Sequence, residues 1–96
     1  MKARQLFRFK DRRGSVIVEM GIWALPAATE ERSHALKYRL FCGRPDACVV
    51  RYDNESGKGD HRHYGDREEP YRFESVERLL DDFRQDCARL AGWRWE

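Results

Sequence analysis

The sequence predicts an α+β domain: a four-stranded antiparallel meander sheet packed on one face by a C-terminal α-helix. Before residue 54, four segments are rich in strand-forming residues or alternate polar and apolar side chains, and turn residues separate them. After residue 75 the apolar spacing changes to that of an amphipathic helix. Because 96 residues support one modest core, residues 1–96 are expected to form a single domain.

The first two strands are expected to form a hairpin. Residues 2–10 alternate, with Phe7 and Phe9 on one side. Four cations share the other side with one leucine, in the order Lys2, Arg4, Leu6, Arg8 and Lys10. A charged turn at 11–14 leads to residues 15–25, which are rich in strand formers. A cationic strand of this kind suits nucleic-acid binding, but it is also typical of a protected sheet edge.

The third and fourth strands are expected at 37–42 and 47–53, joined by a turn. The polar segment before them lacks apolar periodicity, so His34 is expected to be a solvated loop residue. No Cys-x-x-Cys pair is present, which argues against a disulfide framework or a common zinc clip. The three cysteines fall at inward positions of the pattern and are expected to be buried free thiols: Cys42, Cys48 and Cys87.

The helix is predicted from one apolar stripe, formed by Val76, Leu79, Leu80, Phe83, Cys87 and Leu90. Ser75 is the expected N-cap, and Gly92 the expected stop signal. Two tryptophans follow the helix, Trp93 and Trp95. Their rings either fold back on the domain or remain available for a partner.

Composition indicates a charge-rich cytoplasmic protein without a membrane segment. Charged residues make up 38% of the chain, no apolar run reaches the length of a membrane span, and the first residues lack the apolar core of a secretion signal. Residues 1–45 carry ten Lys and Arg against four Asp and Glu, whereas 46–96 carry nine against thirteen. This asymmetry predicts either a surface that meets phosphates or attraction between the two halves.

The segment with the clearest functional pattern is Asp60-His61-Arg62-His63, directly after Gly57-Lys58-Gly59. Histidine exchanges protons near neutral pH, so two neighbouring imidazoles suit proton transfer or metal binding. In an extended segment His61 and His63 point to the same side. The glycines let Lys58 and backbone N–H groups approach a phosphate, although the spacing is not that of a P-loop.

The sequence resembles the TumE family over nearly the whole chain, and three blocks carry the resemblance. They are Lys37-Tyr38-Arg39, the segment Tyr52-Asp53-Asn54-Glu55-x-Gly57-Lys58-Gly59-Asp60-His61-Arg62-His63, and Arg67-Glu68-Glu69-Pro70-Tyr71-x-Phe73. The resemblance implies a small bacterial toxin of a type II toxin-antitoxin system, which inhibits growth. It also implies a cognate protein antitoxin, expected to bind DNA.

A ribonuclease hypothesis combines this resemblance with the histidines. His61 and His63 would act as general acid and base on RNA, Lys58 would stabilise phosphate charge, and Asp60 would orient an imidazole. No metal or other cofactor is expected. The expected substrate-binding residues are cationic or aromatic: Arg62, Tyr64, Arg67, Tyr71, Arg4 and Arg8.

Two alternatives compete with this hypothesis. His61 and His63, together with Asp60 or Asp53, could bind a divalent cation in a metal-dependent nuclease or phosphoesterase. The charged residues around the histidines could instead pair with one another on a solvated surface. The protein would then be a non-catalytic toxin or regulator that acts by binding a protein or a nucleic acid.

Overall fold

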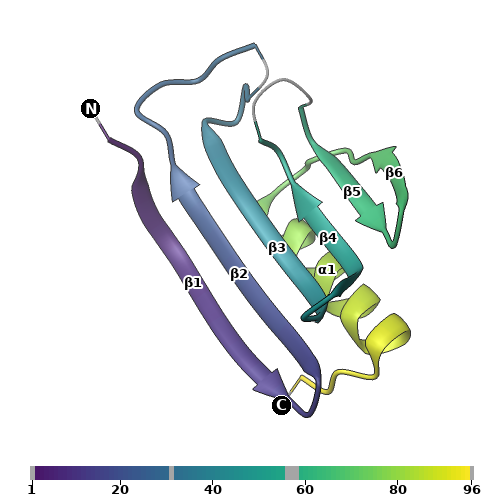
Figure 1. The fold of residues 1–96 in the computed structure, drawn as a ribbon. Coiled ribbons are helices and arrows are strands. Elements are labelled where there is room, and N and C mark those ends of the chain that lie inside the picture. Colours follow the sequence, from purple (N-terminus) through teal and green to yellow (C-terminus); the bar gives the residue numbers. More distant parts are fainter. Residues whose placement is uncertain (1, 31, 56–58, 96) are drawn as a thin grey trace.

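The computed structural model describes residues 2–30, 32–55 and 59–95, which form six strands and one helix (Figure 1). The strands make a single antiparallel sheet in chain order. The elements are β1 Arg4–Arg13, β2 Val16–Ala24, β3 Leu36–Arg44, β4 Ala47–Asp53, β5 His61–Tyr64, β6 Arg67–Pro70 and α1 Val76–Ala91. The α+β class, the meander and the C-terminal helix are confirmed, whereas the expected number of four strands is wrong.

The two additional strands form a short hairpin beyond β4. β5 and β6 have four residues each, and their side chains are mostly polar on both faces. They lack an alternating apolar pattern because α1 packs mainly on β4 and β3 and leaves this end of the sheet with little core to cover. The histidine segment, which follows the four expected strands, contributes His61–Tyr64 as a fifth, paired strand.

A β-bulge divides the expected row of cations on β1. Arg8 pairs with Gly21, but the register shifts between Gln5 and Phe7, so Arg4 pairs with Ala24. Directly paired residues share a face of the sheet. The bulge therefore places Arg4 on the helix-covered face and leaves Arg8 on the open face, so the prediction of four cations on one face is wrong.

The helix begins and ends at the predicted caps. The Ser75 hydroxyl accepts a hydrogen bond of 3.1 Å from the backbone N–H of Arg78. At the other end Gly92 adopts the left-handed conformation, and its N–H donates to the carbonyl of Ala88. The helix bounds therefore follow from local signals.

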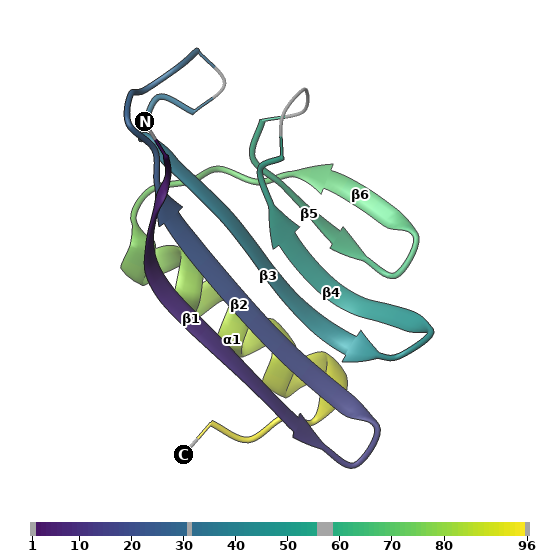
Figure 2. The same cartoon turned by 60° about the vertical axis from the view of Figure 1, so that its left-hand side comes forward.

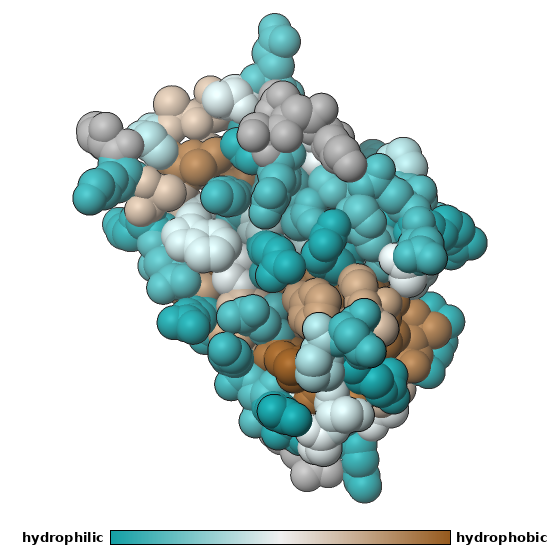
Figure 3. Space-filling view, in the orientation of Figure 1, coloured by the Kyte–Doolittle hydropathy of each residue, from teal (hydrophilic) through white to brown (hydrophobic). Residues whose placement is uncertain are grey.

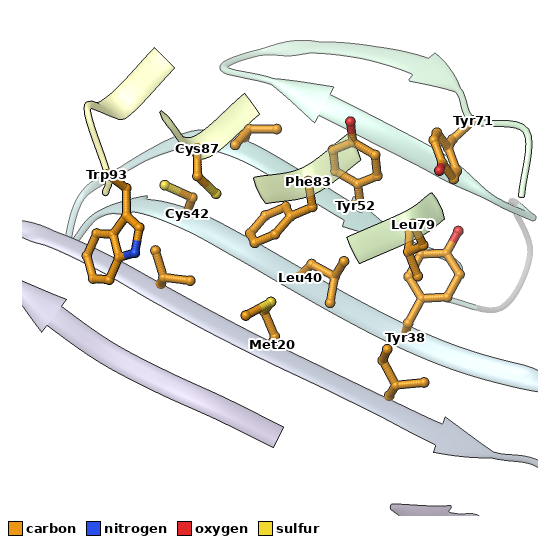
Figure 4. Close-up of a cluster of buried hydrophobic side chains, with 13 residues drawn as sticks. Met20, Tyr38, Leu40, Cys42, Tyr52, Tyr71, Leu79, Phe83, Cys87 and Trp93 are labelled. Carbon is orange, nitrogen blue, oxygen red and sulfur yellow. The ribbon is translucent and has the colours of Figure 1, made fainter. Parts of the chain in front are cut away.

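The core lies between α1 and strands β2, β3 and β4 (Figure 4). Leu79, Phe83 and Cys87 point from the helix onto the sheet. Cys42 and Cys87 are buried free thiols, as predicted. Cys48 is only half-buried, because a register shift pairs it with Gly43 on the open face.

The C-terminal tail folds back on the β1–β2 hairpin rather than standing free. Trp93 is buried, and the Arg13 guanidinium lies over its ring at 4.3 Å. The ring of Trp95 packs against Phe9, with 5.9 Å between the centroids. These contacts decide between the two alternatives that the sequence left open for the tryptophans.

The face of the sheet opposite the helix is uncovered (Figures 1 and 2). Figure 3 shows this face, on which hydrophilic residues predominate and paler or apolar atoms appear between them. No helix in the described part of the chain is long and apolar enough to cross a membrane.

Candidate functional site

Five ionisable side chains gather on the open face where β4, β5 and β6 run side by side. The register pairs Asp53 with His61, Arg51 with His63, and His63 with Glu68. All five therefore point away from the helix. We call this group the histidine cluster.

His61 is the most enclosed imidazole of the histidine cluster, with a side chain that is 7% exposed. Its Nε2 atom lies 2.6 Å from Oδ1 of Asp53, and its Nδ1 atom lies 2.9 Å from the carbonyl oxygen of Gly59. A carboxylate and a carbonyl both accept hydrogen bonds, so each nitrogen faces an acceptor. Both nitrogens are therefore placed beside groups to which an N–H can donate.

His63 has a different environment. Its Nε2 atom lies 3.0 Å from Nη2 of Arg51, which can only donate, and 3.1 Å from Oε2 of Glu68. Burial lowers the pKa of His63, and the nearby Arg51 charge lowers it further. The nearby Glu68 carboxylate raises the same pKa, but the lowering effects are larger, so the neutral ring is favoured.

The two rings meet edge to face, with 5.0 Å between their centroids. Arg51 links them, because its Nε atom also lies 2.7 Å from Oδ2 of Asp53, the carboxylate that holds His61. A hollow of about 280 Å³ opens beside His61 and Glu68. Because both rings lie on the open face and contact each other, the prediction that His61 and His63 point to one side is confirmed.

The histidine cluster also contains a possible set of metal ligands. Donor atoms of Asp53, His61 and His63 all lie within 4.8 Å of one another. Two imidazoles and one carboxylate can bind a divalent transition metal. The Arg51 guanidinium, however, already brings a positive charge to both Asp53 and His63.

A family model described as toxin TumE matches residues 3–91. The chain belongs to the TumE toxin family. Neither the curated proteins nor the solved structures contain a significant match to it. Membership supports the role of a toxin in a toxin-antitoxin system and implies a cognate antitoxin. The blocks that carry the TumE resemblance include Asp53, His61, His63 and Glu68, so most of the histidine cluster lies within them.

In this TumE-family chain Asp60 holds a different imidazole from the two expected. Its carboxylate accepts a 2.7 Å hydrogen bond from the Tyr38 hydroxyl and lies 3.1 Å from Nε2 of His34. The His34 Nδ1 atom accepts from the N–H of Leu36, which leaves the ring proton on Nε2, facing Asp60. His34, expected in solvent, also packs on Phe73 with 4.1 Å between the ring centroids.

Three of the expected substrate-binding residues lie on the helix side of the sheet. Arg62 pairs with Glu69 at 2.6 Å, while the hydroxyls of Tyr64 and Tyr71 donate to carboxylates of the helix. Burial raises the pKa of both tyrosines. Beside Arg62 lies a hollow of about 630 Å³, across the sheet from the histidine cluster. These residues are therefore separated from the two imidazoles.

The remaining predicted residues are dispersed. Arg67 is exposed and lies over the Tyr64 ring at 5.4 Å. Arg8 lies on the open face and Arg4 on the other. Lys58 falls outside the described residues, so its expected role beside a phosphate stays a prediction.

Arg51 and Glu68 are the members of the histidine cluster to which sequence reasoning gave no role, and Asp53 was named only as a metal ligand. Arg51 and Asp53 do carry a local signal, since they alternate with buried Val50 and Tyr52 and so belong to the open face. Glu68 carries no such signal. Only the β5–β6 pairing brings it to His63.

Proposed function

We propose that this TumE-family toxin is a ribonuclease in which His63 is the general base and His61 the general acid. The observation that carries the proposal is the contrast between two adjacent imidazoles. The nitrogens of His61 face two acceptors, whereas Nε2 of His63 lies between an Arg51 donor and the Glu68 carboxylate. Pairs of titratable groups with such opposed environments are typical of acid and base partners.

The reaction that two imidazoles suit is transfer of a phosphodiester to the neighbouring 2′-hydroxyl. His63 takes the hydroxyl proton, and the 2′ oxygen forms a bond to phosphorus as the bond to the 5′ oxygen breaks. His61 gives its proton to that departing oxygen. The products are a 2′,3′-cyclic phosphate and a 5′-hydroxyl. Each proton transfer typically contributes ~10²–10⁴-fold to the rate.

Arg51 and Asp53 would support these two steps. The Asp53 carboxylate, 2.6 Å from Nε2 of His61, accepts a hydrogen bond from the acid and fixes its ring. A phosphate that enters the site would compete with His63 for the Arg51 guanidinium, because arginine binds phosphate oxygens strongly. Arg51, with Lys58 as predicted from the sequence, would then stabilise charge on the transition state.

A matched set of three histidine variants tests the proposal. We expect His61→Gln and His63→Gln each to lower RNA cleavage by ~10²–10⁴-fold and to relieve growth inhibition. His34→Gln is the control, since His34 contacts Asp60 and lies outside the histidine cluster. Circular dichroism establishes that each variant folds. Undiminished cleavage by both cluster variants would contradict acid/base catalysis, and growth inhibition without RNA cleavage by the wild type would indicate a non-catalytic toxin.

Metal-assisted hydrolysis of RNA is a second candidate, favoured by the convergence of Asp53, His61 and His63. The Nδ1 contact of His61 with the Gly59 carbonyl also resembles the second-shell hydrogen bond of a metal-bound histidine. The charge of Arg51 in the same cluster makes acid/base catalysis the better-supported candidate. Activity that survives a chelator supports acid/base catalysis. Activity lost to the chelator and restored by one divalent cation supports the metal.

We further propose that the cognate antitoxin is a DNA-binding protein and that the pair acts in the cytoplasm. Family membership supports this proposal. The neighbouring reading frame should restore growth when it is co-expressed and should retard DNA from its own promoter in a gel-shift assay. A neighbour that restores growth without binding DNA would contradict the DNA-binding part of the proposal.

A further inference from the structure

Two rows of side chains cross the open face of the sheet, and each row reaches a histidine of the cluster. The strand registers align one row as Lys10, Glu19, Phe41, Arg51 and His63. They align the other as Arg8, Gly21, Arg39, Asp53 and His61. From β1 to β5 each row spans four inter-strand spacings, about 19 Å. A continuous surface therefore joins the β1 edge to the proposed catalytic centre.

Two aromatic rings lie flat on this face because glycines make room for them. A Cβ atom at Gly21 would lie 2.4 Å from the Trp23 ring, and one at Gly43 would lie 2.4 Å from the Ala47 carbonyl oxygen and 2.9 Å from the tip of the Phe41 ring. Each ring therefore covers the position where a side chain would otherwise stand. Both rings are half-exposed, and a cation lies over each: Lys37 over Trp23 at 5.8 Å and Arg39 over Phe41 at 5.6 Å. Flat, partly exposed rings on a sheet are the usual stacking platforms for unpaired bases.

The described part of the open face carries an excess of cations, several of which have no carboxylate partner. Among the described residues, Arg8, Lys10 and Arg39 form no ion pair with a carboxylate. On the helix side Arg62, Arg78 and Arg89 are each paired with a carboxylate. Six cations occupy the described open face, namely Arg8, Lys10, Arg12, Lys37, Arg39 and Arg51. They outnumber its three carboxylates, Glu19, Asp53 and Glu68.

We propose that the open face binds single-stranded RNA and leads the strand across the sheet, from β1 to the histidine cluster. Arg8, Lys10 and Arg39 contact phosphates, while Trp23 and Phe41 stack on bases. An unpaired strand fits because its bases are free to stack on the rings, whereas those of a duplex are enclosed. This inference rests on the proposed function for its choice of RNA, and it adds the form of the substrate and the residues that hold it.

Binding can be measured separately from cleavage with a fluorescein-labelled 2′-O-methyl RNA of about 12 nucleotides, whose blocked 2′ oxygens cannot attack phosphorus. Each phosphate contact contributes about 0.7 to the slope of log affinity against log salt for a single strand. We expect Arg8→Ala/Arg39→Ala to reduce that slope by about 1.4. Arg72→Ala/Arg84→Ala removes the same charge outside the open face and should leave the slope unchanged.

Ring substitutions test the stacking platform. Phe41→Leu and Trp23→Leu should each weaken binding by roughly 5- to 150-fold, the range expected for loss of one stacked base. Trp95→Leu on the tail, which packs against Phe9, is the aromatic control and should bind like the wild type. A duplex of the same length should bind more weakly than the single strand.

The outcomes separate this inference from the proposed catalysis. If the platform variants lose affinity while the wild type cleaves no RNA, the binding face stands and the ribonuclease proposal fails. The inference is overturned if the wild type does not bind the labelled strand, or if platform and control variants bind equally. Equal affinity for duplex and single strand also overturns it. A face that serves a protein partner would give one of these overturning results.

Discussion

At the scale of single residues, the three histidines differ because of their hydrogen-bond partners. His61 faces two acceptors, His63 lies between an arginine donor and the Glu68 carboxylate, and His34 is held between a backbone N–H and the Asp60 carboxylate. Their intrinsic chemistry is the same. The partners therefore decide which ring is suited to give a proton, which to take one, and which to support the fold.

The lowered pKa of His63 predicts a specific pH profile. If His63 is the base, kcat/KM should rise with pH through a pKa below about 6.5, the ordinary histidine value. Arg51→Gln should move this rise to higher pH, because the variant removes a positive charge that opposes protonation. The movement should be partial, since burial is the larger cause. Steady-state rates measured from about pH 4 to about pH 8 test the position of this rise in both proteins.

Arg72→Gln is the control for the pH profile, because Arg72 is an exposed residue between β6 and α1. It should leave the profile unchanged. A profile that Arg51→Gln does not move would contradict the proposed interaction with His63.

The same lowered pKa has a consequence for stability, because protonating His63 is disfavoured in the folded state. The contribution of His63 to the free energy of unfolding is present above the ordinary histidine pKa and is lost as pH falls through the lowered value.

At the scale of elements, the β5–β6 hairpin is the part of the fold that builds the site. It supplies His61, His63 and Glu68 and pairs them with Arg51 and Asp53 of β4. Little of its stability comes from the core, because α1 packs mainly on β3 and β4. Backbone pairing and the turn at Gly65 therefore position both imidazoles.

Two matched turn substitutions test this dependence. Gly65 and Gly14 have φ values of 60° and 59° in short hairpin turns, and a Cβ atom at either would meet no neighbour within 4 Å. Gly65→Ala and Gly14→Ala should each cost about 1 kcal/mol of unfolding free energy through backbone strain. Only Gly65→Ala should also lower cleavage when the protein is fully folded. Denaturant unfolding and cleavage assays measure the two effects, and equal activities would contradict the positioning role.

Element signals in the sequence differ in strength along the chain. The caps at Ser75 and Gly92 and the apolar stripe predicted the helix correctly, because they act within one or two turns. The short hairpin was missed, since polar strands without a core face carry no apolar alternation. The bulge in β1 was missed for a related reason: it depends on the pairing with β2.

At the scale of the whole molecule, α1 closes the core against the sheet. Phe83 is fully buried between α1 and the sheet, whereas Leu90 of the same helix is 40% exposed. Phe83→Ala should lower the unfolding free energy by about 3–5 kcal/mol, a large part of the roughly 5–15 kcal/mol expected for a small domain. Leu90→Ala is the control and should cost much less. Denaturant unfolding measures both, and equal costs would contradict this account of the core.

The sequence by itself determined the α+β class, the helix and its caps, most of the core positions, and the histidine pair with its common direction. These features depend on local periodicity and on residue chemistry, which can be read from the order of residues alone. Only the tertiary structure decided that Arg51, Asp53 and Glu68 surround the imidazoles, that Asp60 serves His34, and that Arg62, Tyr64 and Tyr71 face the helix. The physical reason is strand register: it joins residues far apart in the chain, and a shift of one residue moves a side chain to the opposite face of the sheet.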